Sequence, residues 1–238
     1  MTSIADESEF SAAVYEHEKG KLNYRLFKPS HFKDGAALVL TLHGSSSKGS
    51  DNKAQLRKDR GPMELKAFIK KNKLNAVVLA PQCPSGTMWA DTPWYGKSHT
   101  MKKEPTRVMT QTIALVKSQI KALKIDPSRV YVTGVSIGGF GCWDIIQREP
   151  KLFAAAIPVC GGADTAFAET LKNMPIWIFH GDNDTIVYTK RSRDMAAALK
   201  KAGSTQFKYT EYPNTGHDAF TPSYNNPNVL KWLFEQKK

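Results

Sequence analysis

One stretch decides the fold of this chain: VYVTGVSIGGF, residues 130–140. Its β-branched and aromatic beginning is typical of a buried strand, and residues 139–146 are consistent with a helix. Between them, Gly134, Ser136 and Gly138 match G-x-S-x-G, the sharp turn that holds a nucleophilic serine above a parallel sheet. The glycines have a mechanical reason, because the serine backbone is strained there and its neighbours must let strand and helix approach. We therefore predict an α/β fold in which Ser136 is the nucleophile.

A serine hydroxyl is a weak nucleophile at neutral pH and needs a base, which in turn needs a carboxylate to orient it. In proteins with this turn the acid follows the serine along the chain and the histidine comes last. A predicted buried strand over residues 175–179 leads into the loop with Asp184, and an alternating strand over 206–212 leads into the turn with His217. Catalytic groups gather at the carboxyl ends of parallel strands, so we expect Ser136, Asp184 and His217 to converge there.

Other interpretations of these residues stay open at this point. Taken alone, Ser136 could be a helix N-cap, His217 a surface histidine in a turn, and Asp184 a residue of an Asx turn. Asp182 competes for the acid role because it lies in the same loop. Asp218 is a weaker competitor, since adjacent side chains seldom point the same way. The order of all the elements along the chain favours the catalytic interpretation.

The negative charge that develops on an attacked carbonyl needs hydrogen-bond donors, and two turns can provide them. An apolar strand is expected over residues 36–42, and the loop after it begins with His43. We predict that the backbone N–H groups of Ser45 and Ile137 form the oxyanion hole. His43 and His180 are expected to be structural, bracing the oxyanion loop and the acid loop respectively.

With these motifs the chain resembles the α/β-hydrolase superfamily, in the group of serine esterases that includes predicted esterases, dienelactone hydrolase-like and phospholipase/carboxylesterase proteins. It is also similar to polyhydroxybutyrate depolymerases and to feruloyl and acetylxylan esterases. The resemblance implies Ser136 as nucleophile, His217 as base and Asp184 as acid, the last within H-G-x-x-D-x-x-V. It covers most of the chain from about residue 36 onward and is carried by Leu38–Gly49, Ala80–Pro84, Asp126–Asp144, Phe153–Asp164, His180–Val187 and Gly216–Leu233.

Three departures from the pattern of this family concern the pocket rather than the catalytic groups. Ser45–Ser47 stand where relatives are richer in glycine, Ile137 stands where methionine is common, and Phe220 stands where tryptophan is frequent. True dienelactone hydrolases use a cysteine nucleophile, so Ser136 argues against that activity. The departures leave the identity of the substrate open.

The length of 238 residues is enough to bury a full core, and we expect a single α/β-hydrolase domain over 1–238 with a flexible tail over 1–10. No run of 18 apolar residues occurs, so no membrane span is predicted. The acidic beginning is not a signal peptide; we expect a periplasmic or secreted protein if a leader has been removed, and a cytoplasmic one otherwise. A monomer is favoured.

The cysteines argue against a disulfide scaffold, because the chain has only Cys83, Cys142 and Cys160. Cys142 is expected in the core under the turn helix. Cys160 follows another strand end, so it lies either near the active site or in the core, and we favour a structural thiol. No cysteine or histidine cluster has zinc spacing and no acidic run resembles a calcium loop, so we predict no metal and no cofactor.

Strands and helices alternate along the chain, which predicts a mostly parallel, doubly wound central sheet without a large lid domain. An antiparallel hairpin is expected from residues 12–16 and 21–28. Apolar residues spaced by four and three predict a helix over 105–124, with Pro105 in its first turn and a buried face of Met109, Ile113, Val116, Ile120 and Leu123. Further strands are expected over 76–82 and 154–159, and further helices over 62–72, 189–201 and 227–236.

The loop over residues 84–96 follows a strand end and is rich in aromatic residues. We predict that Trp89, Trp94 and Tyr95 line the substrate cleft; the alternative is that they fill the core beneath the loop. No long insertion follows the strand over 154–159, where many lipases have a lid. The cleft is therefore expected to be open and to accept small-molecule or polymer-linked esters rather than long-chain lipids.

The formal net charge is +12, and basic residues are concentrated over residues 48–73. Such a field could steer anionic substrates, although a solvated surface is the simpler interpretation. No nucleic-acid-binding motif accompanies the charge, so no nucleic-acid partner is predicted.

Three functions follow from these patterns. We favour a serine carboxylesterase that acts through an acyl-enzyme on short-chain, aryl or polysaccharide-linked esters, such as feruloyl or acetyl esters. A serine peptidase of the prolyl-oligopeptidase type has the same order of triad residues but usually adds a large propeller domain. The third possibility is a non-catalytic protein that binds polyanions on a hydrolase scaffold.

Overall fold

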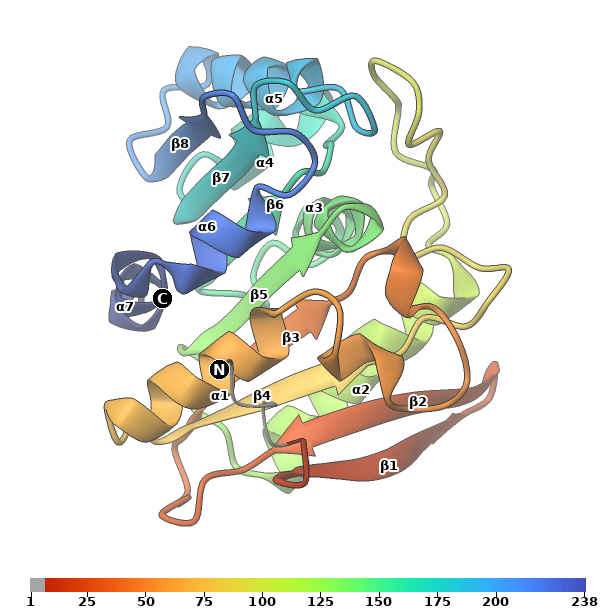
Figure 1. The fold of residues 1–238 in the computed structure, drawn as a ribbon, viewed down its shortest axis with the longest axis vertical. Coiled ribbons are helices and arrows are strands. Elements are labelled where there is room, and N and C mark those ends of the chain that lie inside the picture. Colours follow the sequence, from red (N-terminus) through yellow and green to blue (C-terminus); the bar gives the residue numbers. More distant parts are fainter. Residues whose placement is uncertain (1–6) are drawn as a thin grey trace.

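An eight-stranded sheet organises residues 7–238, the part of the chain that the computed structural model describes (Figure 1). Across the sheet the strands run in the order β1-β2-β4-β3-β5-β6-β7-β8. In chain order they are β1 (Phe10–His17), β2 (Gly20–Phe27), β3 (Ala37–Leu42), β4 (Ala76–Pro81), β5 (Val130–Val135), β6 (Ala155–Val159), β7 (Ile176–Gly181) and β8 (Phe207–Tyr212). β1, β2 and β4 pair antiparallel and the other neighbours pair parallel, which confirms the predicted sheet and its N-terminal hairpin.

Helices cover both faces of the sheet, and each face has its own apolar core. One layer contains α2 (Arg107–Ala122), α3 (Ile137–Arg148), α4 (Ala168–Leu171) and α5 (Lys190–Lys201), and the other contains α1 (Gly61–Lys71), α6 (Phe220–Asn225) and α7 (Pro227–Glu235). β3 shows how one strand serves both layers, because Leu38 and Leu40 face the first core while Ala37 and Val39 face the second. The carboxyl ends of the parallel strands therefore stay free to hold the loops of the site.

The predicted buried face of α2 is partly wrong. Its most buried apolar residues are Val108, Met109, Leu115 and Val116, whereas the expected Ile113, Ile120 and Leu123 are only partly buried. The helix also begins later than predicted, at Arg107, because the Thr106 side chain accepts the Met109 N–H at 3.1 Å and caps it. Pro105 accordingly precedes the helix.

Short elements were not predicted from the sequence. They are α4, α6 and the 3₁₀ turns η1 (Ser45–Ser47), η2 (Ala54–Leu56) and η3 (Thr165–Phe167). Each is too short to show a helical period, so tertiary contacts decide it. No helix within residues 7–238 is long and apolar enough to cross a membrane.

The expectation of a flexible tail over residues 1–10 is wrong for residues 7–10. Residues 1–6 lie outside the described residues, but Phe10 is buried and already begins β1. Glu7 forms an ion pair with Arg57 at 2.8 Å, and Glu9 forms one with Lys70 at 2.7 Å. These contacts also neutralise part of the basic segment over 48–73.

Candidate active site

The turn between β5 and α3 has the strained geometry that its motif predicts. Ser136 has φ 55° and ψ −120°, a left-handed backbone conformation that is costly for a residue other than glycine. A Cβ atom on Gly138 would lie 1.9 Å from the Leu42 carbonyl oxygen, and one on Gly134 would lie 2.2 Å from the Gly138 carbonyl oxygen. Both glycines are therefore needed for the close approach of strand, turn and helix.

The three side chains expected to converge do so at the carboxyl ends of β5, β7 and β8. His217 Nε2 lies 2.9 Å from Ser136 Oγ, and His217 Nδ1 lies 2.7 Å from Asp184 Oδ2. The Asp184 side chain is buried, whereas the His217 side chain is 24% exposed. This chain of hydrogen bonds connects a partly buried hydroxyl to a carboxylate in the interior.

Asp184 is held by more than His217. Its Oδ1 accepts the backbone N–H groups of Ile186 and Val187, each at 2.9 Å, and its Oδ2 lies 3.1 Å from His180 Nε2. Burial by itself raises the pKa of Asp184, but hydrogen bonds from the two imidazoles and the Val187 N–H outweigh it. The pKa of this carboxyl therefore lies below its ordinary value, and the group is ionised. His180 is fully buried and braces the acid loop, as predicted.

The two competing carboxylates have other partners. Asp182 accepts the Thr215 N–H at 3.1 Å and so connects the acid loop to the turn that precedes His217. Asp218 accepts the Thr221 N–H at 3.2 Å, near the start of α6. Among the described contacts, only Asp184 joins a carboxylate to the His217 ring.

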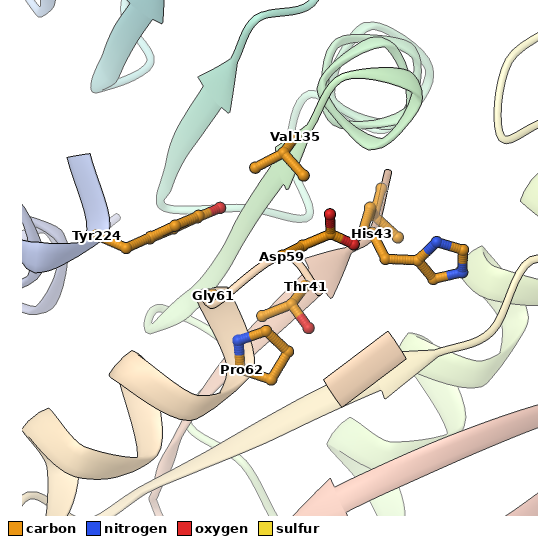
Figure 2. Close-up of a pocket in the computed structure, with 8 residues that line it drawn as sticks. Thr41, His43, Asp59, Gly61, Pro62, Val135 and Tyr224 are labelled. Carbon is orange, nitrogen blue, oxygen red and sulfur yellow. The ribbon is translucent and has the colours of Figure 1, made fainter. Parts of the chain in front are cut away.

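The loop after β3 is anchored by a residue that the sequence reasoning missed. Asp59 is buried, and its Oδ2 accepts both the Gly44 N–H at 2.9 Å and the Ser47 hydroxyl at 2.8 Å. Figure 2 shows its carboxylate beside a cavity of about 10 Å³ that Val135 and Tyr224 also line, room for about one water molecule. The only signal in the sequence is an acidic residue placed between two basic ones.

His43 braces the same loop, as predicted. Its Nε2 accepts the Cys83 N–H at 2.9 Å, and its Nδ1 donates to the Gly44 carbonyl at 2.7 Å. Burial lowers the pKa of His43, which keeps the ring neutral in this tautomer. The backbone N–H groups of Ser45 and Ile137 stand at the first positions of η1 and α3, and within residues 7–238 neither has an acceptor.

Comparison with known proteins identifies the family of this chain. The sequence profile of the dienelactone hydrolase family matches residues 77–231. The chain belongs to this family. A probable carboxylesterase of Oryza sativa subsp. japonica is 24% identical over 195 residues, which cover 77% of this chain and 82% of the rice protein. The poly(3-hydroxyalkanoate) depolymerase C of Paucimonas lemoignei is 30% identical over 147 residues, or 59% of this chain and 32% of that protein.

A solved structure resembles this chain over a longer stretch than these two relatives do. The crystal structure of a thermostable esterase superposes with a TM-score of 0.89 at 32% identity and covers 97% of this chain. The chain spans 64% of the length of that esterase. This member of the dienelactone hydrolase family is therefore an α/β-hydrolase of the carboxylesterase type.

The aromatic loop of this dienelactone hydrolase family member differs from the expectation. Trp89 is fully buried, and its indole N–H donates to the His43 carbonyl at 3.0 Å, so it fills the core beneath the loop instead of lining a cleft. Trp94 and Tyr95 are 39% and 67% exposed and contact each other edge to face. The Arg191 side chain donates to the Pro93 and Gly96 carbonyls, both at 2.6 Å, and holds this part of the loop against α5.

Proposed function

We propose that this chain is a serine carboxylesterase in which Ser136 is the nucleophile, His217 the general base and Asp184 the orienting carboxylate. The observation that carries the proposal is the pair of hydrogen bonds of 2.9 Å and 2.7 Å that links the three side chains. Geometry of this kind lets an imidazole take the serine proton while an ionised carboxylate stabilises the imidazolium that forms. The low pKa of Asp184 supports the same assignment.

The reaction proceeds in two halves. Ser136 Oγ attacks the ester carbonyl carbon as its proton passes to His217 Nε2, and the carbonyl oxygen becomes an oxyanion held by the Ser45 and Ile137 N–H groups. The carbon–oxygen bond to the alcohol then breaks, and His217 gives its proton to the leaving alcohol. A water molecule repeats the sequence on the acyl-enzyme, releasing the carboxylic acid and restoring the serine.

We infer short-chain, aryl or polysaccharide-linked esters as substrates. Between β6 and β7 the chain forms only η3 and the four-residue α4, which leaves no long insertion there to act as a lid. Trp94 and Tyr95 are exposed on a loop that the Arg191 side chain holds in place, which suits contact with an aryl group or a polymer chain. Similar proteins include a polyester depolymerase and a bifunctional acetylxylan esterase/xylanase of Neocallimastix patriciarum.

The test compares nitrophenyl esters with peptide anilides in the wild type and in Ser136→Ala. We expect ester hydrolysis in the wild type and a fall in kcat of roughly 10⁴-fold or more in Ser136→Ala. Ser46→Ala, a change to an exposed serine on the neighbouring loop, is the matched control and should retain the wild-type rate. A preference for anilides would favour the peptidase instead. Full ester hydrolysis by Ser136→Ala would refute the assignment of the nucleophile.

A further inference from the structure

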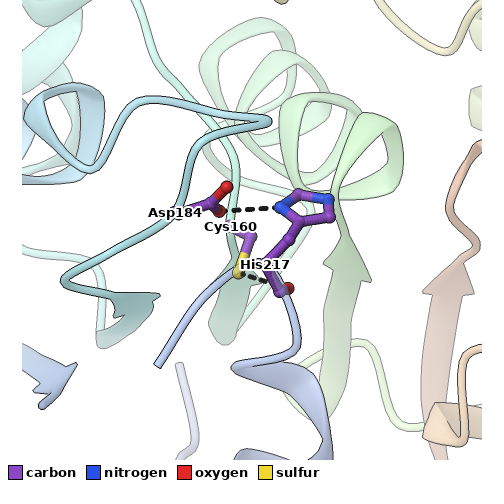
Figure 3. A group of neighbouring side chains, drawn as sticks. All are labelled: Cys160, Asp184 and His217. Carbon is purple, nitrogen blue, oxygen red and sulfur yellow. Dashed lines mark hydrogen bonds and ion pairs between the residues drawn. The ribbon is translucent and has the colours of Figure 1, made fainter. Parts of the chain in front are cut away.

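Cys160 lies directly behind the proposed triad. It follows β6 with φ 48°, and its backbone N–H donates to the Phe179 carbonyl at 2.9 Å, which joins the end of β6 to β7. Its Sγ donates to the His217 carbonyl at 3.4 Å. Figure 3 shows the sulfur beside the hydrogen bond between Asp184 and His217. The sequence favoured a structural thiol, but this position brings the sulfur to the triad.

We propose that Cys160, Asp184 and His217 form an inhibitory binding site for a thiophilic divalent cation such as Zn²⁺ or Cd²⁺. One ligand atom from each of these side chains lies within 4.8 Å of the other two. Two ligands of a tetrahedral zinc ion stand about 3.5 Å apart, as its bonds of about 2.0–2.3 Å require. Small movements of the side chains are therefore sufficient to enclose the ion. The inference rests on the proposed roles of His217 and Asp184.

The donor set selects the kind of metal. A thiolate, an imidazole nitrogen and a carboxylate oxygen are the ligands of zinc and of softer cations, whereas magnesium and calcium prefer oxygen alone. One thiolate and one carboxylate together balance the charge of a divalent ion. Such compensation is needed here because Cys160 and Asp184 are both buried.

Binding exchanges protons for the cation. Burial, and then the neighbouring Asp184 charge, raise the pKa of the Cys160 thiol, so it is protonated when the site is free. The metal–sulfur bond forms as this proton leaves to solvent. The metal also takes the lone pair at His217 Nδ1, so the ring proton that bonded Asp184 moves to Nε2. One proton is released for each cation bound, and affinity rises with pH.

Inhibition follows from the new tautomer of His217. In the free protein Nε2 has a lone pair directed at Ser136 Oγ, 2.9 Å away. With the metal on Nδ1, Nε2 carries a hydrogen and cannot accept the serine proton. Because the ion binds at Nδ1 and not at the Nε2 atom that faces Ser136 Oγ, the substrate cleft stays open. We therefore expect kcat to fall while KM is nearly unchanged.

The experiment is a titration with CdCl₂ that follows ester hydrolysis and the ultraviolet absorption of the cadmium–thiolate bond. Wild type should lose activity in step with the absorption band at one equivalent of cadmium and recover on addition of EDTA. Cys160→Ala, and Cys160→Ser as a second variant, should lack the band and require at least about tenfold more cadmium for inhibition relative to their own uninhibited rates. Cys142→Ala, which removes another buried thiol whose Sγ bonds the Val132 carbonyl, is the matched control and should behave like wild type.

The outcomes separate this inference from the proposed function. Ser136→Ala should still show the band, because the serine is not a ligand. A band with no esterase activity in the wild type would leave the metal site in place and refute the proposed function. Equal inhibition of wild type and Cys160→Ala, or no band in wild type, would overturn the metal site while the esterase assignment stands.

Discussion

Two buried carboxylates, Asp184 and Asp59, stand on opposite sides of Ser136 and hold the two loops between which an ester would react. Asp184 is bonded by two imidazoles and two peptide N–H groups, whereas Asp59 is bonded by one peptide N–H and one serine hydroxyl. In the proposed mechanism only the first carboxylate therefore has a partner, His217, that gains and loses a proton during hydrolysis. The second has partners whose dipoles stay fixed.

The difference teaches that residue type and depth do not determine the role of a buried acid. In the proposed mechanism the negative charge of Asp184 is needed, because it selects the His217 tautomer and stabilises the imidazolium. At Asp59 an oxygen acceptor is needed, because it fixes Gly44 next to the predicted oxyanion donor at Ser45. Replacing each carboxylate by an amide separates the two requirements, since asparagine keeps an acceptor oxygen and loses the charge.

The largest effect is expected from Asp184→Asn. The amide orients His217 in the wrong tautomer, so kcat for a nitrophenyl ester should fall by about 10⁴-fold. Steady-state kinetics at neutral pH measure the change. Asp182→Asn, which alters the same loop but not the His217 contact, is the control and should retain most of the activity. A fall in kcat of less than tenfold in Asp184→Asn would show that catalysis does not require the negative charge of Asp184.

At Asp59 the fall in activity should depend on whether an acceptor oxygen remains and not on the negative charge. Asp59→Ala leaves the Gly44 N–H without its partner and lets the oxyanion loop shift, so kcat should fall by about 10²-fold with little change in KM. Asp59→Asn should be much milder. Equal falls in kcat for Asp59→Ala and Asp59→Asn would contradict the need for an acceptor oxygen at Asp59. A fall in kcat for Asp59→Asn as large as that for Asp184→Asn would show that the two carboxylates do not differ in their need for charge. Thermal melting of each variant separates a shifted loop from a destabilised fold.

Acid should remove the stabilisation that Asp184 supplies. Its pKa in the folded protein lies below the ordinary carboxyl value of 3.8, so on acidification the unfolded chain binds this proton first. The free energy of unfolding should thus be higher for wild type than for Asp184→Asn by the largest amount above about pH 4. This difference should shrink as the pH falls below about 4. Urea unfolding of both proteins at about pH 7 and about pH 3 measures this difference. If the difference in the free energy of unfolding grew in acid, the pKa of Asp184 in the folded protein would be raised and not lowered.

The smallest effect is expected from Tyr224→Phe beside the Asp59 cavity. The Tyr224 hydroxyl lies 2.7 Å from Thr133 Oγ1, which also bonds the Ile157 carbonyl at 2.8 Å, so Thr133 keeps a partner in the variant. We expect a cost of about 1 kcal/mol in the free energy of unfolding and nearly unchanged kcat. A large fall in kcat would show that the cavity, and not only the bond from Asp59 to Gly44, supports the oxyanion loop.

The success of sequence reasoning varied with the range of the interaction. The strands were predicted to within about two residues at their ends, because their apolar runs end at glycine, proline or polar residues. The convergence of Ser136, Asp184 and His217 was predicted because each follows a strand of one parallel sheet. Trp89 was wrongly expected in the cleft, since its position depends on a hydrogen bond to residue 43, far along the chain.

By itself the sequence determined the alternation of strands and helices and the strained turn at Ser136, because these depend on neighbouring residues and on the absence of a Cβ atom at two glycines. The tertiary structure alone decided that Asp59 fixes the oxyanion loop and that Cys160 lies behind the triad. These contacts join segments that only the strand order brings together, and no local period or spacing encodes which strands become neighbours.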